Sequence, residues 1–240
     1  MWIKACLNGA RRPSENPAIP VTPEQIAAEA VAAAAAGARA VHVHPKDADG
    51  ADSLDADIVA AAVRAVRAAA PDLPLGVTTG AWALPEPAQR VAAVSGWTVL
   101  PDFASVNWSE DGSDDVAAVL ASRGVGIEAG LFHAQAVANW AASPHRSACI
   151  RLMIELRPSP DFTAEADALL AQIRATDPDT PVLLHGFGAG VWGGIEHAAR
   201  RGLQTRVGFE DTVLMPDGTP APGNAALVGA AYAIAAAATA

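Results

Sequence analysis

The feature that most constrains the fold is the regular alternation of short apolar runs with longer helix-like segments. The apolar runs lie at 2–7, 39–43, 74–78, 102–107, 125–128, 149–154, 181–185 and 205–209. The helix-like segments lie at 23–36, 55–69, 86–94, 114–122, 133–142, 163–176, 191–202 and 222–239. Short apolar runs with little polar alternation are typical of strands buried on both faces of a parallel sheet.

Eight strands that are each followed by a helix predict an α/β fold, a closed (β/α)8 TIM barrel. The length of 240 residues suits one such barrel, which typically takes roughly 250 residues. We therefore expect a single domain over residues 1–240. A doubly wound open sheet is the main alternative, and the count of eight favours the barrel.

Composition excludes several classes of function. Hydrophobic residues make up 51% of the chain, which indicates a folded globular protein. The formal net charge of −10 argues against binding to nucleic acid or to an anionic membrane. An acidic substrate would need local positive charge, from a metal ion or from arginine.

The cysteines and the two ends of the chain indicate a cytoplasmic protein. Cys6 and Cys149 lie in apolar runs and form no disulfide framework. The opening MWIKACLNGARR lacks the long apolar run of a signal peptide. The tail AALVGAAYAIAAAATA is interpreted as a closing helix on the barrel flank, in preference to a membrane anchor, because alanine is only weakly hydrophobic.

The second strand carries two histidines at its carboxyl end, where barrel enzymes gather their functional groups. His42 and His44 are two residues apart, so both side chains point to the same side of the strand. Strand eight is close to strand two in a closed barrel, and Glu210 at its end can reach both imidazoles. Two histidines and one carboxylate predict a catalytic divalent-metal site, with zinc as the expected ion. A hydrogen-bonded histidine pair without a metal is the alternative.

Strand eight also supplies an arginine and a second carboxylate, Arg206 and Asp211. Asp211 is predicted to accept a proton or to pair with Arg206. The alternative for both residues is a structural ion pair that closes the barrel.

The remaining strand ends supply further candidates. Glu128 ends the fifth predicted strand and Glu155 the sixth, and either is a possible general base or the partner of a neighbouring arginine. Thr78, Thr79 and Asn107 offer hydroxyl and amide groups that can orient a substrate carboxylate or carbonyl, with loop capping as the alternative.

Several motifs together give the chain a family resemblance. These are GARAVHVHPKDADG, the TTG after strand three, SVNW, GIEAG and RVGFEDT. They resemble the β-keto acid cleavage enzymes, also called 3-keto-5-aminohexanoate cleavage proteins, and the resemblance runs from about residue 3 to about residue 235.

The resemblance implies a (β/α)8 barrel, a divalent metal that is usually zinc, and a homo-oligomer, either a dimer or a tetramer. It implies a Claisen-type exchange in which a β-keto acid and acetyl-CoA give acetoacetate and a new CoA ester. By motif, the metal ligands would be His42, His44 and Glu210. Arg206, Asp211 and Glu128 would be catalytic, and Thr78, Thr79 and Asn107 would help to hold substrate.

Two positions depart from the family pattern. Arg11 stands where members that take amino-substituted keto acids carry glutamate, with Glu15 close behind. If Arg11 faces the pocket as a substrate-binding residue, an anionic or neutral substrate is favoured. After strand six, Glu155 and Arg157 replace small residues and would change the pocket.

Two other functions compete with this one. A metal-dependent hydrolase of the amidohydrolase kind would use His185 and Asp211 in addition, although its H-x-H pair normally ends strand one. A non-catalytic barrel that binds a small acid is the third hypothesis.

Overall fold

The computed structural model describes residues 1–240 and contains eight strands and eight α-helices in alternation. The strands are β1 (Ile3–Cys6), β2 (Ala40–Val43), β3 (Leu75–Val77), β4 (Phe103–Asn107), β5 (Gly126–Leu131), β6 (Cys149–Leu156), β7 (Val182–Gly186) and β8 (Thr205–Val207). The helices are α1 (Pro23–Ala35), α2 (Ala56–Ala69), α3 (Pro87–Ser95), α4 (Ser113–Ser122), α5 (Ala134–Ala142), α6 (Phe162–Thr176), α7 (Val191–Arg200) and α8 (Asn224–Thr239). Short 3-10 turns precede β6 and α7.

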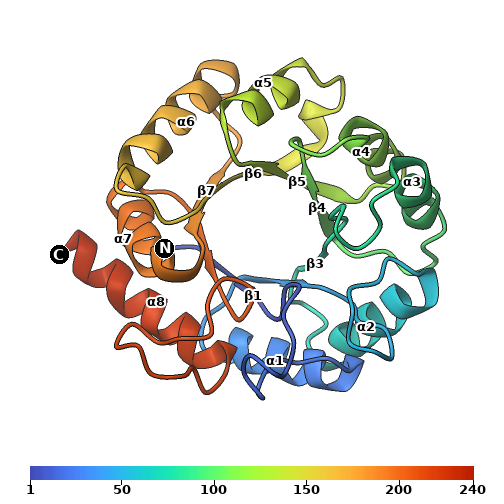
Figure 1. Cartoon of the computed structure of the whole chain (residues 1–240), viewed down its shortest axis with the longest axis horizontal. Coiled ribbons are helices and arrows are strands. Elements are labelled where there is room, and N and C mark those ends of the chain that lie inside the picture. Colours follow the sequence, from blue (N-terminus) through green and yellow to red (C-terminus); the bar gives the residue numbers. More distant parts are fainter.

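All strand pairs are parallel, in the order β7-β6-β5-β4-β3-β2-β1-β8. The remaining gap between β7 and β8 is closed by a parallel bridge between Leu183 and Gln204. Backbone hydrogen bonds on both sides of that bridge join Gln204 to Val182 and Leu184. The strands thus form a ring inside a ring of helices (Figure 1), which confirms the predicted (β/α)8 barrel.

The first helix begins at Pro23, as predicted, and ends at Ala35, one residue before the predicted end. Thr22 caps it: its hydroxyl accepts from the Gln25 backbone, and the Gln25 side chain accepts from the Thr22 backbone. Pro23 occupies the first helical turn. Gly37 follows the helix with a φ of +105°, a conformation that favours glycine and stops the helix.

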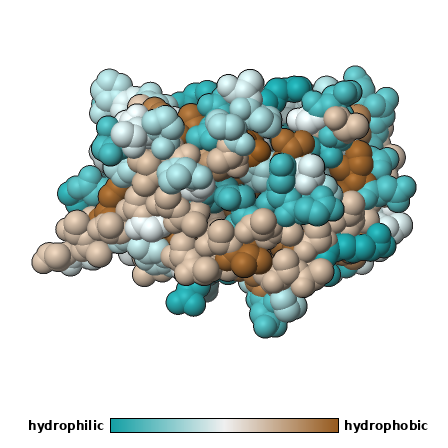
Figure 2. Space-filling view, turned by 90° about the horizontal axis from the view of Figure 1, so that it is seen from below, coloured by the Kyte–Doolittle hydropathy of each residue, from teal (hydrophilic) through white to brown (hydrophobic).

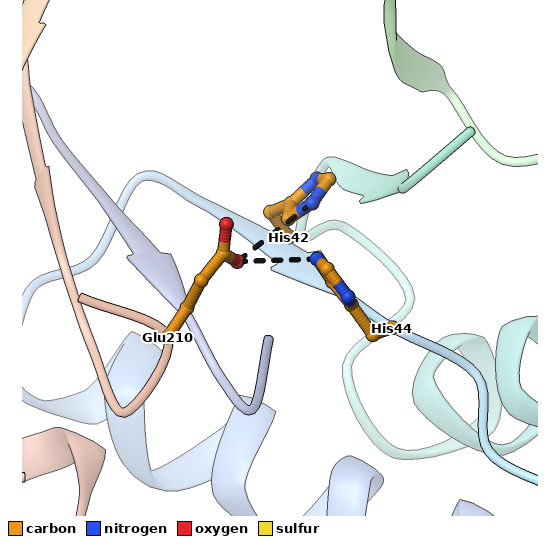
Figure 3. A group of neighbouring side chains, drawn as sticks. All are labelled: His42, His44 and Glu210. Carbon is orange, nitrogen blue, oxygen red and sulfur yellow. Dashed lines mark ion pairs between the residues drawn. The ribbon is translucent and has the colours of Figure 1, made fainter. Parts of the chain in front are cut away.

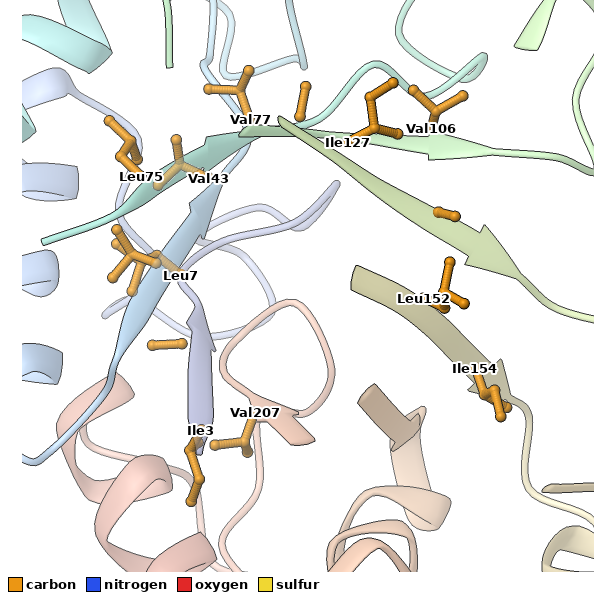
Figure 4. Close-up of a cluster of buried hydrophobic side chains, with 14 of the residues drawn as sticks. Ile3, Leu7, Val43, Leu75, Val77, Val106, Ile127, Leu152, Ile154 and Val207 are labelled. Carbon is orange, nitrogen blue, oxygen red and sulfur yellow. The ribbon is translucent and has the colours of Figure 1, made fainter. Parts of the chain in front are cut away.

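The core lies mainly between the outer face of the barrel and the helices. Aliphatic residues such as Val41 and Val43 point outward into a cluster of 52 buried hydrophobic residues, part of which is drawn in Figure 4. The residues that alternate with them point inward. The barrel lumen consequently holds charged and polar side chains, among them Lys4, His42 and Arg206, which are all buried.

The alanine-rich tail forms α8, which packs beside α1 and α7 and against β1 and β8. This confirms its interpretation as a helix on the barrel flank. Weakly apolar residues, pale brown in Figure 2, spread over the face that contains α8 and α1. None of the helices combines the length and hydrophobicity needed to cross a membrane.

Two strands extend further than predicted. β5 continues to Leu131, so the prediction that this strand ends at Glu128 is wrong, and Glu128 lies in its middle. β6 continues to Leu156 and includes Glu155. β5 continues beyond Glu128 because the next residues, Ala129 to Leu131, pair with the neighbouring strands β4 and β6.

Candidate active site and metal centre

Three potential metal ligands meet at the carboxyl end of the barrel. His42 lies in β2, His44 follows that strand, and Glu210 lies in the turn after β8. Their ligand atoms all lie within 4.8 Å of one another. Figure 3 shows both imidazoles directed toward the Glu210 carboxylate, whose Oε2 is 3.8 Å from His42 Nε2 and 3.5 Å from His44 Nε2.

The geometry of this group fits a metal ion. The separations of 3.5 and 3.8 Å are too long for hydrogen bonds. Zinc binds nitrogen and oxygen at about 2.1 Å, so tetrahedral ligands lie about 3.4 Å apart. His44 Nε2 and Glu210 Oε2 are buried and have no hydrogen-bond partner. Buried polar atoms without partners are costly, and a shared cation would satisfy both.

The charges around the group also suit a cation. Burial lowers the pKa of His42 to about 3, so this imidazole is neutral and has a free lone pair. Burial alone would lower the pKa of His44, but the Glu210 and Asp52 carboxylates outweigh it and raise that pKa to about 9. Burial would raise the pKa of Glu210, but the charge of Arg206 and the two imidazoles hold it well below its usual range. Glu210 is therefore an anionic ligand.

A buried carboxylate, Asp52, holds His44 from the opposite side. His44 Nδ1 lies 2.7 Å from Asp52 Oδ2, and the Trp82 indole donates to the same oxygen at 2.8 Å. Lys46 donates to Asp52 Oδ1 at 2.5 Å. The Trp82 ring stacks on the His44 imidazole with centroids 5.7 Å apart. These contacts fix the orientation of His44.

Arg206 forms a second centre beside the metal group. Its guanidinium donates to Asp211 Oδ1 at 2.7 Å and to Glu210 Oε1 at 2.8 Å. It also donates to His185 Nδ1 at 3.2 Å, and His185 Nε2 lies 3.3 Å from Glu155 Oε2. Asp211 is fully buried, and its Oδ2 has no hydrogen-bond partner. Arg206 thus links the proposed metal ligand Glu210 to a carboxylate with a free oxygen.

A pocket of about 440 Å³ opens over both centres. It is lined by Ala10, Arg11, Glu15, His42, Thr78, Trp82, Ser105, Asn107, Phe132, Met153, Glu155, Arg157, Phe187, Arg206 and Glu210. This volume is in the range of small-molecule sites. Five of the 15 lining residues are hydrophobic, and the others are polar or charged.

A family model for beta-keto acid cleavage enzymes matches residues 1–240. The chain belongs to this family. Its members cleave β-keto acids. Barrel enzymes in general carry their active sites at the carboxyl ends of the strands, which is where this pocket opens. No curated protein sequence matches the chain.

Solved structures share the barrel at low identity. Apo ObcA is 18% identical with a TM-score of 0.74, and the match covers 89% of this chain and 61% of ObcA. ObcA in a ternary complex with a C4-CoA adduct and oxalate is 19% identical, with a TM-score of 0.70 and coverage of 89% and 62%. The 3-dehydroquinate dehydratase of Geobacillus kaustophilus HTA426 is 12% identical, with a TM-score of 0.66 and coverage of 99% and 91%. The chain thus spans about three fifths of the length of ObcA.

The residues predicted to bind substrate lie in different surroundings. Arg11, Thr78 and Asn107 line the pocket. Arg11 is paired with Glu15 at 2.7 Å. Thr79 is buried, and its hydroxyl donates to the Ser105 backbone carbonyl at 2.6 Å, which is a contact within the barrel wall.

Glu128 lies apart from the pocket lining. It is fully buried between the side chains of Lys4 and Arg151, and each of its oxygens accepts a hydrogen bond from one of them. Burial would raise the pKa of Glu128, but these two cations lower it to about 2. Its catalytic role stays a prediction, and the contacts have the form of a structural ion pair.

Sequence reasoning missed Asp52, Lys46 and Lys4. Asp52 lies in a polar loop eight residues after His44, and nothing in that loop distinguishes it from Asp47 or Asp49. Lys4 did give a signal, because it is the one charged residue in the apolar run WIKACL. A charge in such a strand requires a buried partner, which the structure supplies as Glu128.

Two glycines allow the loops of the site to approach each other. A Cβ atom on Gly208 would lie 2.0 Å from the backbone oxygen of Cys6. Gly9 has a φ of +57°, and a Cβ atom there would lie 2.6 Å from Glu210 Cγ. Only glycine at these positions lets the turn after β8 bring Glu210 over the end of β1.

Proposed function

We propose that this chain is a metal-dependent β-keto acid cleavage enzyme that exchanges acyl groups with acetyl-CoA. In this reaction the bond between C2 and C3 of the β-keto acid breaks. The released two-carbon acid unit joins the acetyl group to give acetoacetate, and the remaining acyl group leaves as a CoA ester. The observation that carries the proposal is the convergence of His42, His44 and Glu210 with Arg206 and Asp211 at one pocket.

His42, His44 and Glu210 would hold the metal, for which zinc is the proposed ion. Two histidines and one carboxylate leave at least one coordination position open, as catalytic zinc sites do. A bound divalent cation supplies Lewis acidity that polarises a substrate carbonyl.

Arg206 and Asp211 would form the catalytic pair. The guanidinium is oriented by Asp211 and Glu210, so its remaining donor capacity can hold the substrate carboxylate or stabilise charge that develops on a substrate oxygen. Asp211 is the better proton acceptor, because its Oδ2 has no partner. Both Glu128 oxygens are already occupied by cations. Thr78 and Asn107 would orient the substrate from the opposite wall.

The ObcA complexes support the choice of substrates. One contains oxaloacetate and another contains a C4-CoA adduct with oxalate, so a barrel similar to this one accommodates a keto acid and a CoA derivative. We therefore propose that the present chain also binds a keto acid and a CoA derivative.

The test is incubation of purified protein with acetyl-CoA and a panel of β-keto acids, followed by measurement of acetoacetate and of the new CoA ester. We expect both products, loss of activity after dialysis against a chelator, and recovery when zinc is returned. Absence of acetoacetate from every acid, with zinc shown to be bound, would refute the acetyl-transfer reaction. Activity that survives complete metal removal would refute metal dependence.

A further inference from the structure

The three arginines that line the pocket differ in how their charge is compensated. Arg206 is paired with Glu210 and Asp211. Arg11 is paired with Glu15. Arg157 has no carboxylate oxygen within 4 Å, although it lines the same pocket. It is therefore the one pocket arginine that has no carboxylate partner within the protein.

The nearest acidic residue along the chain is already engaged. Glu155 Oε2 lies 3.3 Å from His185 Nε2 and 3.7 Å from Arg206 Nη2. Burial would raise the pKa of Glu155, but His185 and Arg206 hold it below its usual value. Glu155 is thus an anion whose charge is compensated by those two residues, and it leaves Arg157 unpaired.

Arg157 stands across the pocket from the metal group. In the strand order, β2 and β6 are separated by three strands on either side of the ring, so they lie opposite each other (Figure 1). His42 and His44 come from β2, and Arg157 directly follows β6. A substrate that bound with its reacting carbonyl at the metal group and crossed the pocket would have its far end on the side of Arg157.

The backbone of Arg157 is constrained. It is followed by Pro158, and a residue before proline is restricted to extended conformations. Pro160 stiffens the same loop two residues later. Ordering this arginine around a ligand therefore costs less backbone entropy than ordering one in a flexible loop.

We propose that the substrate is a β-keto dicarboxylic acid, and that Arg157 binds the carboxylate at the end remote from the reacting carbonyl. This inference rests on the proposed cleavage of β-keto acids. A guanidinium recognises a carboxylate through two parallel hydrogen bonds, which a neutral alkyl end cannot accept. In a chain with a net charge of −10, an unpaired arginine at the pocket also offsets the repulsion of a doubly charged acid.

The test compares three acids of equal chain length with the zinc-loaded protein and acetyl-CoA: 3-oxoadipate, 3-oxohexanoate and 5-amino-3-oxohexanoate. We expect kcat/KM for 3-oxoadipate to exceed that for the neutral acid by about 10-fold or more. Arg157→Leu should remove this preference through KM while changing the neutral acid less than about twofold. Arg157→Lys should retain part of it.

Arg64→Leu is the matched control, since Arg64 is an exposed arginine on α2 that does not line the pocket. Equal kcat/KM for the dicarboxylic and neutral acids in the wild-type protein would overturn the inference and identify Arg157 as an ordinary solvated surface residue. An equal loss for both acids in Arg157→Leu would also overturn it, because Arg157 would then act on a part that the two acids share.

Failure of the proposed function would give a different result, namely no turnover of any acid. Calorimetric binding of 3-oxoadipate and 3-oxohexanoate without acetyl-CoA separates the two cases. We expect Arg157→Leu to weaken binding of the dicarboxylic acid about 10-fold and to leave the neutral acid unchanged. Unchanged binding of 3-oxoadipate would overturn the inference whether or not turnover is observed.

Discussion

The Nδ1 atom of His44 lies 2.7 Å from Oδ2 of Asp52, and this contact decides which nitrogen of His44 faces the other potential ligands. An ionised carboxylate only accepts, so Nδ1 carries a hydrogen. In the neutral imidazole, which is the form that binds a metal ion, the lone pair is then on Nε2, the nitrogen that faces Glu210. Trp82 donates to the same oxygen and covers the imidazole ring, which holds both partners in place.

Asp52→Asn is expected to weaken zinc binding by about 10- to 100-fold. The substitution removes a negative charge, and an amide oxygen accepts the hydrogen bond from His44 Nδ1 more weakly than a carboxylate does. Competition with a chromophoric chelator measures the affinity. Asp49→Asn is the matched control, since Asp49 is exposed in the same loop. Equal affinities in the two variants would contradict the positioning role of Asp52.

His42→Ala is expected to lose stoichiometric zinc while keeping the barrel. The side chain contributes one of three ligands, and a zinc site with two protein ligands is much weaker. Metal analysis after gel filtration measures the ion, and circular dichroism checks the fold. Zinc retained at the wild-type level would show that the ion binds elsewhere.

Arg206→Lys is expected to reduce kcat/KM by about 100-fold or more, because a lysine keeps the charge but cannot donate to both Asp211 and the substrate in a fixed plane. Steady-state kinetics with the best β-keto acid measures the effect. The thermal midpoint of unfolding should be followed in parallel. A fall in activity matched by an equal loss of folded protein would indicate a purely structural arginine.

Glu128→Gln is expected to lower the free energy of unfolding by about 3–5 kcal/mol at neutral pH, because it leaves Lys4 and Arg151 without their counter-charge. The folded-state pKa of Glu128 is about 2, below its ordinary value of 4.5. Its ion pairs therefore stabilise the fold fully above about pH 4.5, and this contribution is lost as the pH falls toward about 2. Denaturant unfolding at a series of pH values should show the difference from wild type shrinking below about pH 4.5.

The control for that series is Glu24→Gln, an exposed carboxylate on α1 without an ion pair. A stability difference for Glu128→Gln that stays constant between about pH 5 and pH 3 would contradict the ion-pair account. A fully folded Glu128→Gln variant with strongly reduced kcat would instead support the catalytic role predicted from the family resemblance.

The architecture and the centre of the candidate site can be predicted from the amino-acid sequence alone. Strand and helix periodicities are local, so the alternation of eight apolar runs with eight amphipathic segments was sufficient to predict the barrel. The spacing of His42 and His44 is also local, because residues two apart on a strand share a face. Glu210 followed from barrel closure, which makes β8 a neighbour of β1.

The surroundings of those residues depend on contacts that form only in the folded barrel. Whether Glu128 is free or paired depends on Lys4 and Arg151, which come from two other strands and meet it only through the register of the closed sheet. Asp52 acquires its role because a loop folds back beneath His44, and Arg157 because β6 stands opposite β2. The ion pairs of Glu128 join positions far apart in the chain, and the loop between His44 and Asp52 has no periodic pattern that would single out one of its carboxylates. No local pattern of residues therefore encodes these contacts.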